Sequence, residues 1–230
     1  SDFMRYIIGL DIGGTKCAVT VGSANGSNVK ILDKKGFATS EVKTADEFFK
    51  KVFEIIDDFK LNYTFDAIGI SCGGPLDENR GIILCPPHLP LLHGVNIVDI
   101  LNGRYSAPVY LRNDANACAL AEWLFGAGKG TKNMAFLTFG TGLGAGLILG
   151  GKLWQGSRGL AGEAGHIRLA EDGPVGYRKK GSFEGFCSGG GIAQLGYIKA
   201  VEMAQKGEYP MYFKKGYTQS DVTAKTIADA

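Results

Sequence analysis

The chain opens with short apolar segments that are separated by glycine-containing turns. Residues 5–10 are almost wholly apolar, which is typical of a buried strand. Gly13 and Gly14 follow, and a glycine pair between two strand-like segments predicts a hairpin. Residues 17–22 form the second segment, and residues 28–39 form a third, more polar one. The pattern therefore predicts a three-stranded antiparallel meander.

A helical periodicity replaces the strand pattern after residue 44. Thr44 and Glu47 have the spacing of a capping box at a helix start. Apolar side chains then recur every three or four residues as far as Phe59, which predicts an amphipathic helix with a buried face. The later elements expected in this half are strands at 67–71 and 108–112, helices at 96–102 and 115–125, and an irregular proline-rich loop at 81–95. Strands followed by crossover helices predict a mixed sheet with helices packed on it.

The second half begins with a similar arrangement. Strands are expected at 133–139 and 144–149, and a third strand begins at Lys152 after a Gly-Gly turn. We interpret this repeated order as a diverged internal duplication, which predicts two related lobes with a cleft between them. A final helix is expected over 220–229.

Composition and charge exclude several classes of protein. Of the 230 residues, 45% are apolar and 21% are charged, as in ordinary globular proteins. The formal net charge of +2 gives no indication of a nucleic-acid partner or an anionic membrane surface. No apolar segment reaches the ~20 residues of a membrane-spanning helix. The five cysteines are scattered singly, so we expect free thiols in the core of a cytoplasmic protein.

Glycine is the residue that stands out, with 35 positions gathered in several clusters. Glycine lets the backbone approach a ligand closely. The first cluster lies in Asp11-Ile-Gly-Gly-Thr-Lys16, where the backbone N–H groups of Gly13 and Gly14, with Thr15 and Lys16, can bind an anion. Asp11 is a candidate for holding hydrated Mg²⁺. The residue order is not that of a P-loop, and a plain hairpin turn is the alternative.

A second candidate phosphate turn lies at 137–146. Its candidate residues are Thr138, Gly140, Thr141 and Gly142. The spacing also fits the dinucleotide fingerprint, but that motif requires a helix to follow, and a strand is expected here. Two similar turns, one in each expected lobe, are better explained as two sides of one triphosphate site.

Three other segments carry polar side chains suited to a sugar. Asp114 lies between Asn113 and Asn116 at a strand-to-helix junction, where it is also a candidate N-cap. Glu163, His166 and Glu184 add two carboxylates and an imidazole in glycine-rich surroundings. Such groups can each hold one or two hydroxyls of a polyhydroxylated ligand, although a lone histidine is often purely structural.

In this order, the segments resemble the ROK family of bacterial sugar kinases and sugar-responsive repressors. The resemblance covers residues 6–200 and rests on four motifs, at 11–16, 112–116, 140–144 and 162–166. It implies an α/β protein with the actin-like ATPase (ribonuclease H-like) fold. It also implies a small lobe over 4–117 and a large lobe over 118–230, with a central cleft and an incomplete second lobe.

The resemblance also implies a reaction. ATP with Mg²⁺ would transfer its γ-phosphoryl group to a hexose or N-acetylhexosamine, commonly at the C6 hydroxyl, with Asp114 as general base. The implied sugar ligands are Asn113, Glu163, His166, Glu184, Gly74 and His88. The implied phosphate ligands are Asp11, Gly13, Gly14, Thr15, Lys16, Thr138, Gly140, Thr141 and Gly142, with Mg²⁺ held by Asp11 through water. A homodimer, without nucleic-acid or membrane partners, is expected.

The sequence departs from the family in three places. Many members carry the zinc-binding run Cys-x-Cys-Gly-x-x-Gly-Cys-x-Glu, but residues 175–184 lack all three cysteines. Because thiolates supply most of the affinity of such a site, we expect no zinc, and the loop at 171–182 must be held by other means. His88 stands where relatives often have Asn, which leaves the sugar open. Family members also continue further, with an adenosine-side segment.

Three other functions remain possible from the sequence. A sugar-responsive regulator of the same family would need a DNA-binding domain ahead of the first strand, where we expect no room for one. A non-catalytic sugar-binding protein is compatible with an incomplete second lobe. Another actin-like enzyme, such as an acid kinase or an ATPase, is disfavoured by Glu163, His166 and Glu184.

Overall fold

The computed structural model describes residues 4–26 and 28–230. It divides into two compact units, the first ending at Thr131 and the second beginning at Lys132. The lobes that the family implies divide the chain between residues 117 and 118, inside helix α3 (Asp114–Phe125) of the first unit. That functional division stays a prediction.

The first unit is built on a five-stranded mixed sheet. Its strands are β1 (Arg5–Ile12), β2 (Lys16–Asn25), β3 (Asn28–Ala38), β4 (Ala67–Cys72) and β8 (Val109–Asn113). They lie in the order β3-β2-β1-β4-β8. The first three are antiparallel neighbours, which confirms the predicted meander, while β4 and β8 run parallel to β1.

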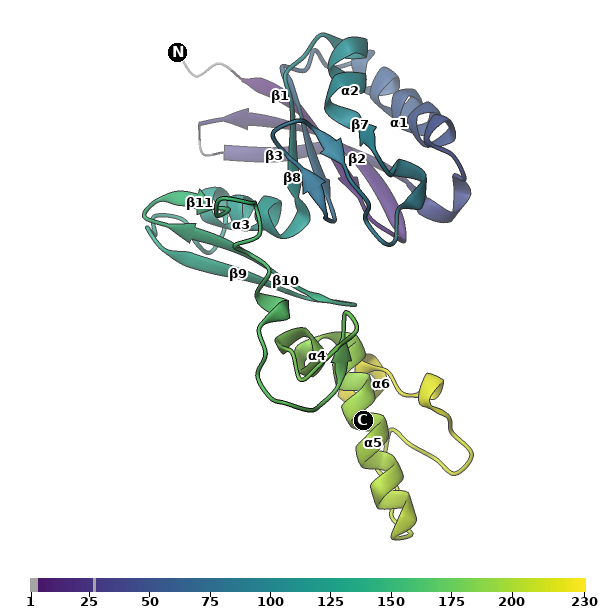
Figure 1. The fold of residues 1–230 in the computed structure, drawn as a ribbon. Coiled ribbons are helices and arrows are strands. Elements are labelled where there is room, and N and C mark those ends of the chain that lie inside the picture. Colours follow the sequence, from purple (N-terminus) through teal and green to yellow (C-terminus); the bar gives the residue numbers. More distant parts are fainter. Residues whose placement is uncertain (1–3, 27) are drawn as a thin grey trace. The chain divides into compact units, whose positions relative to one another are not determined.

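One face of this sheet carries the core. Alternate residues of β1 are buried, namely Ile8, Leu10 and Ile12, because successive side chains of a strand point to opposite faces. Helices α1 (Ala45–Lys60) and α2 (Ile97–Tyr105) lie on the same side of the sheet and share this core (Figure 1). The strand residues that alternate with these buried ones therefore point to the opposite face of the sheet.

Helix α1 begins as its sequence predicts, with one difference in its cap. The Thr44 side chain accepts a hydrogen bond from the Glu47 N–H, at 3.1 Å. The Glu47 carboxylate accepts from the Lys43 N–H, one residue earlier than the capping box requires. The predicted apolar face is confirmed, since Phe48, Val52, Ile56 and Phe59 are buried.

The segment predicted as an irregular loop at 81–95 has more structure than its sequence indicates. Strands β5 (Leu76–Asp77), β6 (Ile82–Ile83) and β7 (Val95–Asn96) form a small antiparallel sheet. A 3-10 turn, Pro90–Leu92, lies between the last two strands. Ile83 and Leu92 are fully buried in the core of the first unit, so this segment is anchored by apolar contacts.

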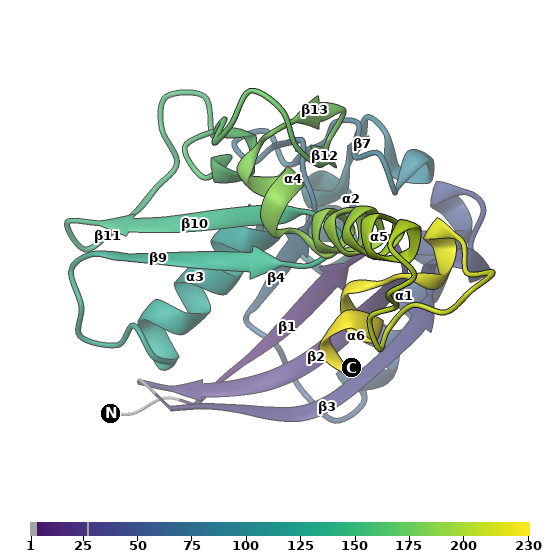
Figure 2. The ribbon, with the colours of Figure 1, turned by 90° about the horizontal axis from the view of Figure 1, so that it is seen from below.

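The second unit begins with the predicted second meander. Strands β9 (Met134–Phe139), β10 (Leu143–Leu149) and β11 (Lys152–Trp154) are antiparallel, in the order β11-β10-β9. Figure 2 shows β9 and β10 side by side. The later elements are η3 (Ala164–His166), β12 (Val175–Gly176), β13 (Lys179–Lys180), α4 (Phe183–Cys187), α5 (Gly189–Gln205), η4 (Gln219–Asp221) and α6 (Ala224–Ala228).

The helix predicted at 220–229 is therefore shorter than expected. It is preceded by the separate 3-10 turn η4, and the Thr223 side chain caps α6 by accepting a hydrogen bond from the Thr226 N–H. In the part of the chain that the structure describes, no helix is both long enough and apolar enough to cross a membrane.

Candidate active site

The first part of the candidate site lies where three strands of the first unit end together. Ile12 of β1 pairs with Cys72 of β4, and Cys72 pairs with Asn113 of β8. The strands are parallel, so their carboxyl ends meet at one edge of the sheet. In open α/β sheets, ligands bind outside this edge.

Asp114 begins helix α3 at this edge. The structure shows that Asn113, not Asp114, is the N-cap, because the Asn113 side chain accepts from the Ala115 N–H at 3.1 Å. The alternative role for Asp114 as N-cap is therefore wrong. Asp114 is exposed, and one of its oxygens, Oδ1, accepts from the same N–H at 2.8 Å. A Cβ built on Gly73 would lie 3.9 Å from the other oxygen, Oδ2.

Glu78 holds this junction and was missed in the sequence. Its carboxylate accepts from the Asn113 N–H at 2.8 Å and lies 3.4 Å from an Arg112 nitrogen. The Glu78 side chain is only 14% exposed. The only signal in the sequence was an acidic residue in a turn, which usually faces solvent. Gly74 lies on the same junction, since a Cβ there would come within 3.3 Å of the Asn113 amide nitrogen.

Asp11 shares these surroundings. It alternates with the buried Leu10 and Ile12, so it points to the sheet face opposite α1 and is exposed. Cys118 is exposed as a residue, but partial burial of its thiol, and then the charges of Asp114 and Asp11, raise the pKa of that thiol. Asp11 pairs with Ser71 of β4, which pairs with Arg112 of β8, so Asp11 lies near the same carboxyl edge of the sheet as Asp114. Binding of a hydrated Mg²⁺ by Asp11 stays a prediction.

The thiols only partly follow the prediction of core cysteines. Cys17 and Cys72 are buried, whereas Cys85 and Cys118 are exposed and Cys187 is intermediate. The prediction is therefore wrong for Cys85 and Cys118. Burial first, then the charges of Asp114, Cys17 and Asp11, raise the pKa of Cys72 to about 12, so this thiol stays protonated at neutral pH.

The turn from Gly13 to Lys16 is tightly closed. The Gly13 N–H donates to the Lys16 carbonyl at 3.0 Å, and a Cβ on Gly13 would lie 2.8 Å from that oxygen. Thr39 anchors the turn, since its hydroxyl donates to the Gly13 carbonyl at 2.7 Å and its N–H to the Thr15 carbonyl at 2.9 Å. Thr39 was also missed, because it lies far from the turn in sequence. The turn leaves exposed backbone where phosphate binding was predicted.

His88 lies against the same turn. A Cβ built on Gly14 would come within 2.8 Å of the His88 Cβ. The loop that carries His88 is closed by a 3.0 Å contact between His93 Nε2 and the Pro86 carbonyl. The structure thus brings a predicted sugar residue next to a predicted phosphate turn within one unit.

The second candidate turn joins β9 and β10. The Gly140 N–H donates to the Gly142 carbonyl at 3.0 Å, and strand β10 follows at once. This confirms that the motif is not a dinucleotide fingerprint, which needs a helix there. Thr141 is exposed, but the Thr138 hydroxyl already accepts from the Gly144 N–H at 3.0 Å. Phosphate binding by these residues stays a prediction.

Glu184 contacts this second turn directly. Its carboxylate accepts from the Leu143 N–H at 2.9 Å. A Cβ on Gly142 would lie 2.7 Å from the same carboxylate, and one on Gly165 would lie 2.4 Å from the Leu143 carbonyl. Glu184 was predicted only as a sugar ligand, and the structure shows that it also fixes the turn.

Glu163 and His166 lie together at the 3-10 turn η3. Their side chains approach to 3.5 Å and are 52% and 44% exposed, respectively. The imidazole of His166 also lies edge-to-face against the Tyr177 ring, with centroids 5.2 Å apart.

Helix α5 begins beside the second turn. The Gly189 N–H donates to the Gly140 carbonyl at 2.7 Å, and the Ser188 hydroxyl caps the helix by accepting from the Gly191 N–H. The N-terminus of a helix carries partial positive charge and favours anions. The sequence showed a glycine cluster here, but gave no reason to place it next to Gly140.

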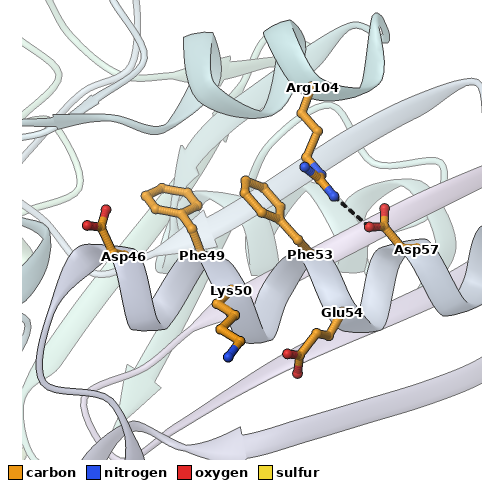
Figure 3. A pocket seen from close by; sticks show the side chains of 7 residues that line it. All are labelled: Asp46, Phe49, Lys50, Phe53, Glu54, Asp57 and Arg104. Carbon is orange, nitrogen blue, oxygen red and sulfur yellow. Dashed lines mark hydrogen bonds and ion pairs between the residues drawn. The ribbon is translucent and has the colours of Figure 1, made fainter.

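A surface hollow of about 360 Å³ lies elsewhere, on helices α1 and α2 (Figure 3). It is lined by Asp46, Phe49, Lys50, Phe53, Glu54, Asp57 and Arg104. Arg104 pairs with Asp57 at 2.6 Å and lies 4.2 Å from the centre of the Phe53 ring. The hollow contains none of the predicted site residues. Of the predicted carboxylates, Asp11 and Asp114 lie at the carboxyl edge of the sheet in the first unit, whereas Glu163 and Glu184 belong to the second unit.

The described residues hold no group of three or more His, Cys, Asp or Glu side chains placed to bind a metal ion. The expected absence of zinc stays a prediction, since it rests on the missing cysteines. A hydrated Mg²⁺ held through water needs no such group.

Comparison with known proteins decides the family. The model of the ROK family matches residues 7–228. This chain belongs to the ROK family. Its similarity to two curated members covers 74% and 99% of the chain. A glucokinase of Streptomyces coelicolor is 31% identical over 228 residues, which are 99% of this chain and 70% of that protein. A glucokinase of Thermotoga maritima is 35% identical over 169 residues, which are 74% of this chain and 52% of that protein.

A solved structure gives the same result for this ROK chain. The crystal structure of a ROK family glucokinase from Streptomyces griseus, in complex with glucose and AMPPNP, is similar with a TM-score of 0.71 and 31% identity. The similarity covers 97% of this chain and 70% of that one. The predicted family and the actin-like α/β fold are confirmed. The chain spans between about half and 70% of the length of these relatives.

Proposed function

We propose that this ROK chain takes part in ATP-dependent phosphorylation of a hexose or N-acetylhexosamine, at the C6 hydroxyl. The observation that carries the proposal is Asp114. Its exposed carboxylate lies at the carboxyl edge of the sheet, beside Gly73 and in the surroundings that Asp11 shares. Membership of a family with glucokinases of about 31–35% identity supports the class of reaction.

In this proposal, Asp114 accepts the proton of the sugar hydroxyl as that oxygen attacks phosphorus. Phosphoryl transfer is catalysed mainly by alignment and charge neutralisation, so a fixed carboxylate at the attacking oxygen is what the chain must supply. Asn113 caps α3, and Glu78 holds the Asn113 N–H, so the backbone next to Asp114 is fixed on both sides. These contacts orient the carboxylate before any substrate binds.

The phosphate groups of ATP would be held by backbone N–H groups of the glycine turns. Gly13 and Gly14 carry no side chain and Gly14 is exposed, so a ligand could approach the backbone of this turn closely. The N-terminus of α5 beside Gly140 adds partial positive charge in the second unit. Bound Mg²⁺ would neutralise phosphate charge, and Asp11 would hold it through water.

The sugar would be recognised by side chains that each hold hydroxyl groups. Glu163 and His166 offer an exposed carboxylate and imidazole at η3. In the first unit, Asn113 offers an amide nitrogen beside Gly74, and His88 lies on the phosphate turn. The choice among glucose, N-acetylhexosamines and other hexoses depends on these four groups.

The test is sugar-dependent ADP release by the full-length gene product, measured across a panel of hexoses and N-acetylhexosamines. We expect one or more sugars to support turnover, with the phosphate on C6 of the product by NMR. Asp114→Asn should retain ATP binding and lose turnover by about 10²–10⁴-fold, which is the range for a general base.

The matched control is Asp46→Asn, an exposed carboxylate on α1, which should leave turnover unchanged. Turnover in Asp114→Asn close to that of the parent protein would remove Asp114 from the role. Absence of ADP release with every sugar would overturn the kinase proposal itself.

A further inference from the structure

The hairpin formed by β12 and β13 contains a strained turn. Its two central residues, Tyr177 and Arg178, have φ angles of 46° and 63°. Two-residue hairpin loops of type I′ need positive φ at both positions, and they usually have Asn-Gly or Gly-Gly there because larger side chains disfavour this conformation. A strained backbone of this kind persists only where the surrounding structure imposes it, and such strain clusters at functional sites.

The side chain of Tyr177 reaches His166. The two ring centroids are 5.2 Å apart and the ring planes meet at 85°, an edge-to-face arrangement that aromatic pairs prefer. The Tyr177 side chain is 65% exposed. Its contact with His166 is therefore not explained as the filling of a core.

The same hairpin holds the backbone at His166. The Lys179 ammonium donates to the His166 carbonyl at 2.6 Å. The Phe183 N–H donates to the Ile167 carbonyl at 2.8 Å, just beyond the histidine. Lys179 of the hairpin thus holds the His166 carbonyl, and Phe183 at the start of α4 holds the next carbonyl, that of Ile167.

The hairpin itself is fixed to helix α5. The amide of Gln194 accepts from the Val175 N–H and donates to the Val175 carbonyl, both at 2.8 Å. A side chain that pairs with both backbone groups of one residue holds the strand as a neighbouring strand would. Tyr177 is therefore carried on a supported element.

Glu163 alone does not fix the imidazole. Its carboxylate is 3.5 Å from His166 Nε2, and both side chains are about half exposed. Ion pairs between exposed side chains contribute little, because solvent screens them and both side chains lose freedom. A second contact is needed to hold the ring in one orientation.

We propose that Tyr177 is a positioning residue, which holds the imidazole of His166 in the orientation that binds a sugar hydroxyl. The inference rests on the proposed function, because it takes His166 as a sugar ligand. The turn adopts an unfavourable backbone conformation, and the Tyr177 ring on this turn orients the His166 imidazole. Lys179 and Gln194 keep the hairpin in register with η3.

Three variants separate the ring from the backbone. Tyr177→Gly removes the ring and relieves the strained φ. Arg178→Gly relieves strain at the next residue and leaves the ring in place. Tyr177→Phe keeps the ring and removes only the hydroxyl. In Tyr177→Gly, the KM for the preferred sugar should rise about three- to tenfold with kcat nearly unchanged, because binding and not chemistry is weakened.

Arg178→Gly and Tyr177→Phe should match the parent protein in KM and kcat. The unfolding temperature of Tyr177→Gly should not fall, because glycine suits a positive φ. Should that variant fail to fold, Tyr177→Asn takes its place, since asparagine tolerates this conformation. An equal rise of KM in Arg178→Gly would assign the effect to the backbone and overturn the proposal.

A second measurement does not depend on activity. The chain has three histidines, so the imidazole signals in an NMR spectrum can be assigned with a His166→Gln variant. The Tyr177 ring should shift the His166 signals by its ring current. That shift should disappear in Tyr177→Gly and persist in Tyr177→Phe and Arg178→Gly.

Unchanged His166 signals in Tyr177→Gly would contradict the contact. If no sugar supports ADP release, the proposed function fails, while the NMR result still decides whether Tyr177 orients His166. Loss of the ring-current shift without any rise in KM would overturn the role in sugar binding and leave the contact as a structural one.

Discussion

The two glycine turns of the molecule have similar sequences but different anchors. The turn at 13–16 is held by a neutral group, the Thr39 hydroxyl, which donates to the Gly13 carbonyl at 2.7 Å. The turn at 140–143 is held by a charged group, the Glu184 carboxylate, which accepts from the Leu143 N–H at 2.9 Å. One anchor thus binds a turn carbonyl and the other binds a turn N–H.

This difference has a chemical consequence. Hydrogen bonds to charged groups contribute about 1.5–3 kcal/mol, compared with about 0.5–1.5 kcal/mol for a typical neutral one. The second turn therefore depends more strongly on its anchor. It also depends on a side chain that is predicted to bind sugar, whereas Thr39 is buried and is not among the predicted site residues.

The largest effect should come from removing the charged anchor. Glu184→Ala should lower kcat/KM by about tenfold to a hundredfold for ATP as well as for the sugar, because the Leu143 N–H loses its partner. Thr39→Val should lower kcat/KM for ATP by only a few-fold, about what loss of a neutral hydrogen bond gives. Steady-state kinetics with each substrate varied in turn measure both.

Glu171→Ala, which removes an exposed carboxylate of the second unit, is the control and should have no effect. If Glu184→Ala changed only the KM for sugar, the carboxylate would be a ligand and not an anchor. Equal losses in Glu184→Ala and Thr39→Val would show that charge makes no difference.

A smaller effect should distinguish the two turns by their packing. A Cβ on Gly14 would come within 2.8 Å of the His88 Cβ, whereas no heavy atom of the described residues lies within 4 Å of one on Gly140. Gly14→Ala should therefore lower the free energy of unfolding by about 1–3 kcal/mol. Gly140→Ala should change it by less than about 0.5 kcal/mol.

Thermal or urea unfolding measures both variants. The double variant Gly14→Ala/His88→Gly should lose less stability than the sum of the two single variants, because the effects of substitutions at residues in contact are not additive. A Gly140→Ala variant that unfolds as easily as Gly14→Ala would show that the packing difference does not govern stability.

The smallest effect should appear as thiol reactivity beneath the first turn. Cys17 is buried, with its sulfur 3.5 Å from the Thr39 hydroxyl. Burial raises the pKa of the Cys17 thiol, so little thiolate is present at pH 8 and a thiol reagent should label it very slowly. The Thr39 hydrogen bond itself lowers the Cys17 pKa, so its loss alone would leave still less thiolate. A several-fold faster labelling in Thr39→Val is therefore expected only from opening of the turn, and it would show that the hydroxyl keeps the turn closed.

The exposed Cys85 is the internal control and should be labelled at the same rate in both proteins. Its labelling can be followed separately by peptide mass spectrometry. A Cys17 rate that does not change in Thr39→Val would mean that the turn stays closed without the Thr39 hydroxyl.

The elements with a clear hydrophobic period were predictable from the sequence. Both meanders and helix α1 were found, because strand alternation and helical spacing report directly on burial. The strands β5, β6 and β7 were not found, because each is only two residues long and is too short to show an alternation of apolar and polar positions. The helix predicted at 220–229 was too long because Thr223 caps a new helix there, and side-chain hydrogen bonds of this kind compete with a continuous helix.

The motifs of the candidate site were predictable from the sequence, but the hydrogen bonds that connect them were not. Asp114 and the two turns carry residue types that indicate phosphoryl-transfer chemistry, yet Glu78, Thr39 and the Glu184 anchor could not be found. Their hydrogen bonds join residues 35, 26 and 41 positions apart. Periodicity indicates which residues are buried, and it contains no information on which distant partner each of them meets.

The pairing of Gln194 with Val175 has a consequence for how the chain behaves in solution. A two-stranded hairpin offers unpaired backbone groups along its outer strand, and another chain can add a strand to such an edge. The amide of Gln194 occupies both the N–H and the carbonyl of Val175. One side chain thus blocks strand addition at that residue.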